Sequence, residues 1–113
     1  MQKYSVNLTE DAENDIAELM AFYEELVDTE SATKFFDEAM ETLANLQSLP
    51  RARAVFKDNP DIYRVQMEKH KVAIVYLVDD GRLEVIAIRA YHQMQDPAQY
   101  QESVRERIRK LRG

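Results

Sequence analysis

The chain begins with a short alternation of apolar and polar residues, which predicts a strand over residues 4–8. Thr9 follows with two acidic residues behind it, the usual arrangement at a helix N-terminus. Apolar residues then recur at steps of three and four, which predicts an amphipathic helix over residues 10–27. The same spacing resumes at Ala32 and lasts until Pro50 ends a second helix. We expect the two helices to form an antiparallel hairpin.

Three runs rich in β-branched and aromatic residues follow, over residues 62–67, 72–78 and 83–90. We expect them to form an antiparallel meander, with a short strand before it at residues 54–56. Basic residues at helical spacing close the chain. The predicted fold class is α+β, in which a small antiparallel sheet packs on a helical hairpin and a short C-terminal helix follows. The sheet comprises the N-terminal strand and the meander. Residues 1–97 are the expected domain, and residues 98–113 form a basic helix or tail.

The Asp80-Gly81 dipeptide predicts a two-residue hairpin turn between the last two strands. With this turn, Val72 lies opposite Arg89. Alternation along the strands then divides the meander into two faces. The face expected under the helices consists of Tyr63, Val65, Met67, Val72, Ile74, Tyr76, Val85 and Ala87. The opposite face consists of Arg64, Gln66, Ala73, Val75, Leu77, Ile86 and Ile88.

This opposite face is mostly apolar, whereas a sheet surface in contact with water normally carries polar residues. One explanation is a protein partner that covers it. The other is that the C-terminal helix covers it. The two explanations can hold in different states of the same protein.

Composition excludes several classes of protein. A chain of 113 residues is one domain by length. The absence of cysteine excludes disulfide scaffolds and thiolate-bound zinc, and with two histidines we expect no metal site and no cofactor. Gly81 and Gly113 are the only glycines, so a glycine-rich phosphate loop is excluded. No apolar run is long enough to cross a membrane, and we expect a cytoplasmic protein without a membrane partner.

The net charge of −6 is unevenly distributed along the chain. Residues 1–50 hold two lysines against twelve acids, and residues 51–113 hold thirteen basic against nine acidic side chains. The acids of the helices are expected at solvent positions. The total argues against a polycationic nucleic-acid binder, but the second half can still attract phosphate or an acidic partner.

Candidate chemistry gathers near the end of the predicted sheet, at Arg64, Arg89, Tyr91 and His92. Such a set can bind a phosphodiester, with His92 as a general acid or base. The alternatives are a histidine bonded to backbone at a strand end, and an ion pair between Arg64 and a helix acid. Residues 69–71, Lys-His-Lys, are expected to form a solvated turn.

Four segments carry a family resemblance: Tyr63-Arg64-Val65, the run from Val72 to Asp80, Val85-Ile-Ala-Ile88, and His92-Gln-Met-Gln-Asp-Pro97. Their order and spacing, after a strand and a helical hairpin, resemble the RelE/ParE superfamily of type II toxins. The resemblance covers residues 4–97. It implies a small toxin, from a plasmid stabilisation system, that a cognate antitoxin holds inactive by wrapping its sheet and helices. The binding residues would be Arg64, Arg89, Val75, Ile86 and Ile88, through strand addition or a helix in a groove.

The superfamily has two main activities. RelE-like members cut mRNA on the ribosome, and ParE-like members inhibit DNA gyrase. The resemblance gives Arg64, His92 and Tyr91 as catalytic residues of a metal-independent endoribonuclease if the chain is RelE-like. The acidity of the chain and its long hairpin favour a ParE-like toxin, although Gln95 stands where the ParE-like signature has arginine. The alternatives are the ribosome-dependent endoribonuclease and an inactive member that serves only as an interaction module.

Overall fold

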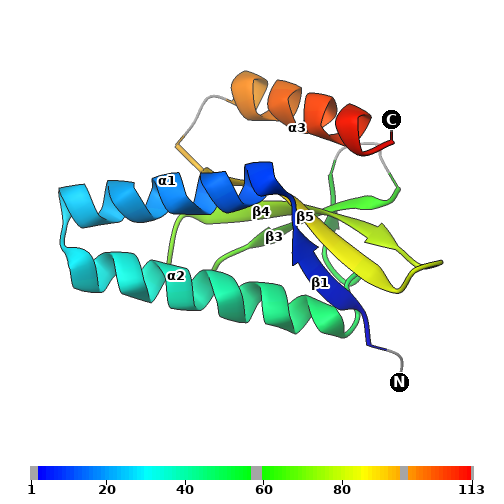
Figure 1. The fold of residues 1–113 in the computed structure, drawn as a ribbon, viewed down its shortest axis with the longest axis horizontal. Helices are drawn as coiled ribbons and strands as arrows, with labels where there is room; N and C mark the ends of the chain where they lie inside the picture. The colour runs from blue at the N-terminus through cyan, green and yellow to red at the C-terminus, as the bar shows by residue number, and fades with distance from the viewer. Residues whose placement is uncertain (1–2, 57–59, 95–96, 113) are drawn as a thin grey trace.

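The computed structural model describes residues 3–56, 60–94 and 97–112. The elements in chain order are β1 (Ser5–Leu8), α1 (Glu10–Leu26), α2 (Thr29–Ala44), the 3-10 turn η1 (Asn45–Gln47), β2 (Ala54–Val55), β3 (Ile62–Gln66), β4 (Val72–Asp79), β5 (Glu84–His92) and α3 (Pro97–Arg112). The predicted α+β fold is confirmed. Figure 1 shows α3 at the top of the molecule and the hairpin of α1 and α2 below it. Within the described residues, no helix is long and apolar enough to cross a membrane.

The helices begin where side chains satisfy their free backbone N–H groups. Thr9 caps α1 as predicted. Asp28 caps α2, because its carboxylate accepts a hydrogen bond from the Ser31 amide at 2.7 Å, so this helix begins three residues before Ala32. It also ends earlier than predicted, since η1 replaces its last turn before Pro50.

The sheet has the strand order β1-β5-β4-β3-β2. Neighbouring strands from β2 to β5 are antiparallel, whereas β1 runs parallel to β5. The prediction of an antiparallel sheet was therefore wrong for β1. A parallel pair requires a long crossover connection, which the helical hairpin and the rest of the sheet supply.

The antiparallel pairing of β4 with β5 is as predicted, but the predicted turn and register between them were wrong. Four residues, not two, connect the strands, and the residue with a left-handed backbone is Leu83 (φ 49°) rather than Gly81. The register is irregular between Val75 and Tyr76, where β5 contains an extra residue. Val72 consequently lies opposite His92, not Arg89.

Each face of the sheet has its own core. The hairpin-side core contains all eight residues predicted for the helix-covered face. The α3-side core combines the opposite face with α3, and its buried members are Ile62, Ala73, Val75, Ile88, Tyr91 and Val104. The C-terminal helix thus covers the second apolar face in this structure.

Candidate functional site

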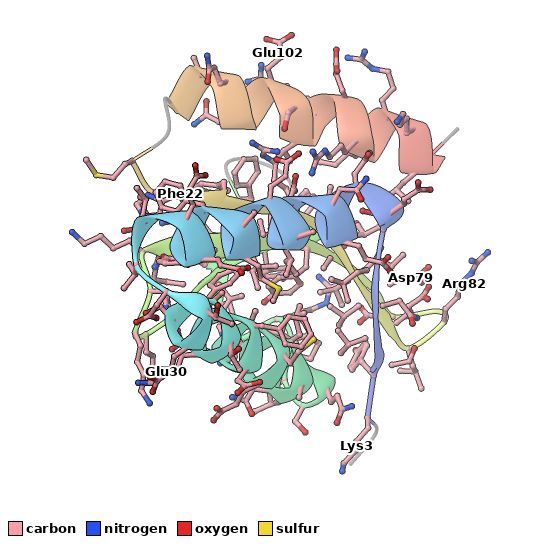
Figure 2. The ribbon with its side chains drawn as sticks, turned by 60° about the vertical axis from the view of Figure 1, so that its left-hand side comes forward. Lys3, Phe22, Glu30, Asp79, Arg82 and Glu102 are labelled. Carbon is pink, nitrogen blue, oxygen red and sulfur yellow. The ribbon has the colours of Figure 1, made fainter. Side chains whose placement is uncertain are left out.

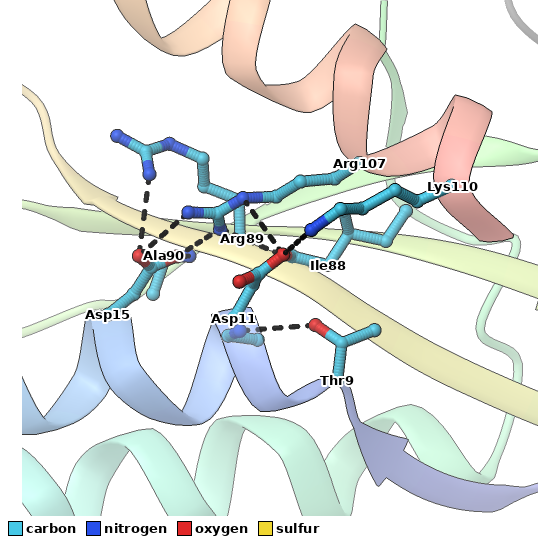
Figure 3. A network of polar contacts seen from close by, with 9 residues as sticks. Thr9, Asp11, Asp15, Ile88, Arg89, Ala90, Arg107 and Lys110 are labelled. Carbon is cyan, nitrogen blue, oxygen red and sulfur yellow. Dashed lines mark hydrogen bonds and ion pairs between the residues drawn. The ribbon is translucent and has the colours of Figure 1, made fainter.

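Asp15 lies on α1 and is a buried charged residue, with only 7% of its surface exposed. Arg107 of α3 donates hydrogen bonds to both carboxylate oxygens of Asp15, with N–O distances of 2.5 and 3.1 Å. Arg89 of β5 approaches the same carboxylate at 3.4 Å, and the amide of Ala90 donates to it at 3.1 Å. Figure 3 shows α1, β5 and α3 meeting at this point. Asp15 therefore ties the hairpin, the sheet and the last helix together.

The two arginines respond differently to this environment. Burial lowers the pKa of Arg89, and the nearby charge of Arg107 lowers it further, while Asp15 opposes both effects. Burial also acts to lower the pKa of Arg107, but its hydrogen bond to Asp15 and the charges of Asp15 and Asp11 raise the pKa overall. Asp15 thus compensates two partly buried cations, and Arg107 is its stronger partner.

Asp15 and Arg107 were not among the predicted site residues. The prediction that the acids of the helices lie at solvent positions was wrong for Asp15. Its spacing is a usable signal, because it stands three residues after Ala12 and four before Leu19, on the apolar stripe of the helix. Arg107 lies three residues after the buried Val104, which places it at the edge of the buried face of α3.

Arg64 and Arg89 lie in one row across the sheet, because each pairs with Val75 from opposite sides. The guanidinium of Arg64 donates to Gln66 at 3.4 Å. The Nε atoms of both arginines are buried and make no hydrogen bond within the described residues. Tyr91 belongs to the same face, in the α3-side core. Three of the four predicted site residues thus lie beneath or beside α3.

His92, the fourth, lies opposite Val72, a residue of the hairpin-side core, and its ring is 6.0 Å from that of Phe22 on α1. Its Nδ1 accepts a hydrogen bond from the Met94 amide at 3.2 Å, so the ring proton lies on Nε2. His92 and Arg64 therefore do not converge on one substrate position. Gln95 and Asp96 of the same motif lie outside the described residues.

The apolar residues that were predicted to bind a partner differ in their burial. Val75 and Ile88 are fully buried in the α3-side core, together with Val104. Ile86 is only partly buried. A partner that uses all three therefore requires α3 to move. Among the described residues, no group of three acidic or histidine side chains has an arrangement suited to a metal ion.

The prediction that His70 lies in a solvated turn was wrong. His70 packs against α1 and α2. Its Nδ1 lies 2.6 Å from Glu38, and its ring contacts Tyr23 and Phe35 edge to face. Burial alone raises the pKa of Glu38, but the hydrogen bonds from His70 and the Lys69 amide outweigh it and hold the pKa below its ordinary value. The pair joins the β3–β4 turn to the hairpin.

Replacing Glu38 with glutamine is expected to lower the free energy of unfolding by about 1–3 kcal/mol at neutral pH, since charged hydrogen bonds are lost. A carboxylate with a lowered pKa stabilises the fold above its unfolded pKa and loses that effect as pH falls through the folded pKa. Urea titrations should therefore show the difference between wild type and E38Q shrinking below about pH 4.3. The exposed Glu41→Gln is the control. A difference that stays constant from pH 7 to pH 3 would contradict this role.

Comparison with family models gives a match over residues 6–97 to the ParE toxin of type II toxin-antitoxin systems, parDE. A comparison with curated proteins finds no match. This match contains the strand, the helical hairpin and the meander.

Solved structures with the same fold include the chromosomal ParDE system from P. aeruginosa, with a TM-score of 0.69 and 19% identity over 80% of this chain and 96% of that one. A double arginine-to-alanine mutant of the E. coli toxin RelE, in the free state, matches with a TM-score of 0.67 and 20% identity. This match covers 93% of this chain and 98% of that one. The intact E. coli RelBE complex matches with a TM-score of 0.58 and 18% identity, over 81% of this chain and 99% of that one. These likenesses show the fold.

Proposed function

Because the chain belongs to the ParE toxin family of type II toxin-antitoxin systems, we propose that it arrests growth by inhibiting DNA gyrase and is neutralised by a cognate antitoxin. The observation that carries this proposal is the family match, which spans the strand, the hairpin and the meander. The resemblance of the sequence to ParE-like members implies gyrase as the target.

The arrangement of the polar residues supports a toxin that is not a nuclease. Cleavage of RNA requires basic and aromatic groups that converge on one phosphate. Here Arg89 is paired with Asp15, and His92 lies apart from Arg64. The net charge of −6 also disfavours binding driven by counterion release.

An antitoxin partner is supported by the relatives and by the second face of the sheet. Solved structures of this fold include the ParDE system of P. aeruginosa and the RelBE complex of E. coli. In this chain α3 lies on the apolar face formed by Val75, Ile86 and Ile88. An antitoxin segment that binds there competes with α3, either as an added strand or as a helix in its place.

One observation favours the RelE-like endoribonuclease as a second candidate. Arg64 and Arg89 flank Val75 in a single row, with Tyr91 on the same face. If α3 leaves this face, the row becomes accessible to a phosphate, while Arg89 keeps Asp15 of α1 as its partner. His92 is not part of this row, so the activity would rest on Arg64, Arg89 and Tyr91.

Expression in cells tests the proposed function. We expect the wild-type protein to arrest growth, with relaxed plasmid DNA in the arrested cells, and we expect co-expression of the cognate antitoxin to restore growth. The Arg64→Ala variant should remain toxic. The target would be the ribosome instead of gyrase if plasmid supercoiling stays intact, mRNA is cleaved and the R64A variant loses its toxicity. A correctly folded protein that causes no growth defect would indicate an inactive interaction module.

A further inference from the structure

Asp15 stands where hydrogen-bond donors from the sheet and from α3 converge on one point. Arg107 donates to both oxygens of its carboxylate, Arg89 approaches at 3.4 Å, and the Ala90 amide donates at 3.1 Å. Figure 3 shows these groups around the carboxylate. Guanidinium groups and main-chain N–H groups bind phosphate oxygens as well as carboxylates. The arrangement is therefore an oxyanion site that a side chain of the same protein fills.

A groove of about 450 Å³ between α1 and the C-terminal end of β5 leads to this site. Its volume is within the range of small-molecule sites. Asp15, Arg89 and His92 are among the residues that line it. Phe22 on its wall is 44% exposed, and Figure 2 shows this side chain on the side of α1 toward α3. The groove thus gives an anion from solvent a route to Arg89.

The two arginines of the sheet row differ in their partners. Arg64 forms no ion pair within the described residues, whereas Arg89 pairs with Asp15. Burial lowers the pKa of Arg89, and among the acids that oppose this effect Asp15 acts more strongly than Glu18. Asp15 is therefore the main anion that compensates Arg89, and only Arg64 is left without an acid.

This internal anion does not depend on α3 for its position. Ala12, three residues earlier on α1, is buried in the hairpin-side core, which contains no residue of α3. When α3 leaves the sheet, Asp15 loses Arg107 but keeps Arg89 and the Ala90 amide. A carboxylate that the fold holds beside its arginine acts at a high effective concentration, so a free phosphate competes poorly with it.

We propose that Asp15 is a specificity-determining residue of this toxin, because its carboxylate occupies the position at Arg89 that a phosphate group of RNA would otherwise take. The row of Arg64 and Arg89 then holds no phosphodiester between its guanidinium groups, whether α3 covers the face or has left it. This inference rests on the proposed function, in which the protein is not a nuclease, and names the side chain that excludes RNA.

Calorimetric titration of the full chain with inorganic phosphate tests this role. Asp15→Asn is expected to bind phosphate at least about tenfold more tightly than wild type, because Arg89 becomes available to another anion. The matched comparison is Arg107→Met, which breaks the same network from the α3 side but leaves Asp15 on Arg89, so its phosphate affinity should equal that of wild type. The exposed Asp11→Asn on the same helix should behave like wild type, and D15N/R89M should lose the gain.

Folding of the variants is checked by circular dichroism, because D15N leaves two partly buried cations without their anion. The variant D15N/R107M retains only one of these cations, and it is expected to show the same gain through Arg89. A short RNA without a terminal phosphate is the second probe, and D15N is expected to bind it more tightly than wild type.

Phosphate affinity in D15N/R107M that equals that of wild type would overturn the assignment. An equal gain in R107M would overturn it too, because α3 rather than Asp15 would then exclude the anion. A gain in phosphate binding without a gain in RNA binding would contradict the role of Asp15 in excluding RNA. These titrations contain neither gyrase nor antitoxin, so their failure would leave the proposed toxin function intact.

Discussion

Replacing Asp15 with alanine is expected to lower the free energy of unfolding by about 3–5 kcal/mol, because removal of one partner from a buried ion pair leaves the other charge uncompensated. Here two guanidinium groups lose their anion at once. The amide of Ala90 loses its acceptor as well. The chain contains no tryptophan, so urea titration followed by far-UV circular dichroism is the suitable measurement.

The matched control is Asp11→Ala on the same helix. Asp11 contacts Arg107 at 3.9 Å and Lys110 at 3.6 Å, and its side chain is 40% exposed. Exposed pairs of this kind contribute about 0–1 kcal/mol, so this variant should remain close to wild type. Equal losses in D15A and D11A would contradict the central place of Asp15 in the fold.

Replacing Val104 with lysine is expected to detach α3 from the sheet and to strengthen antitoxin binding. Val104 is fully buried in the α3-side core, and a cation there lies near the row of Arg64 and Arg89. The rest of the domain keeps the hairpin-side core, which does not involve α3. If α3 must leave the sheet before the antitoxin binds, the apparent affinity is reduced in proportion to the fraction of molecules in which α3 is detached. Detaching α3 permanently should therefore tighten antitoxin binding about tenfold or more.

The control for this variant is Gln99→Lys, which adds the same charge at an exposed position of α3. Hydrogen exchange of the α3 amides reports whether the helix has left the sheet, and calorimetry reports antitoxin affinity. Detachment of α3 without any gain in affinity would show that antitoxin and helix do not share this face.

The two faces of the sheet were predictable because side chains alternate with a period of two. Near the turn, the predicted register between β4 and β5 differs from the observed one by two residues. Because side chains alternate with a period of two, an error of two residues leaves every side chain on its correct face. The extra residue in β5 then reverses the alternation beyond Ala87. It places Arg89 opposite Val75 on the α3 side, where local sequence patterns do not indicate it.

The candidate site was predictable in its residue types but not in its arrangement. The sequence placed Arg64, Arg89, Tyr91 and His92 near one end of the sheet, whereas His92 faces α1 and Tyr91 belongs to the α3-side core. Asp15 was missed because most helix acids do face solvent. Its partner Arg107 lies 92 residues away in sequence, so only the packing of α3 reveals the pair.

The most direct test of the central claim is a supercoiling assay with purified gyrase, run beside an mRNA cleavage assay on translating ribosomes. The purified wild-type protein is expected to block supercoiling, to lose this effect when the antitoxin is added, and to leave mRNA intact. Unaffected supercoiling together with cleaved mRNA, and loss of cleavage in Arg64→Ala, would contradict the gyrase assignment.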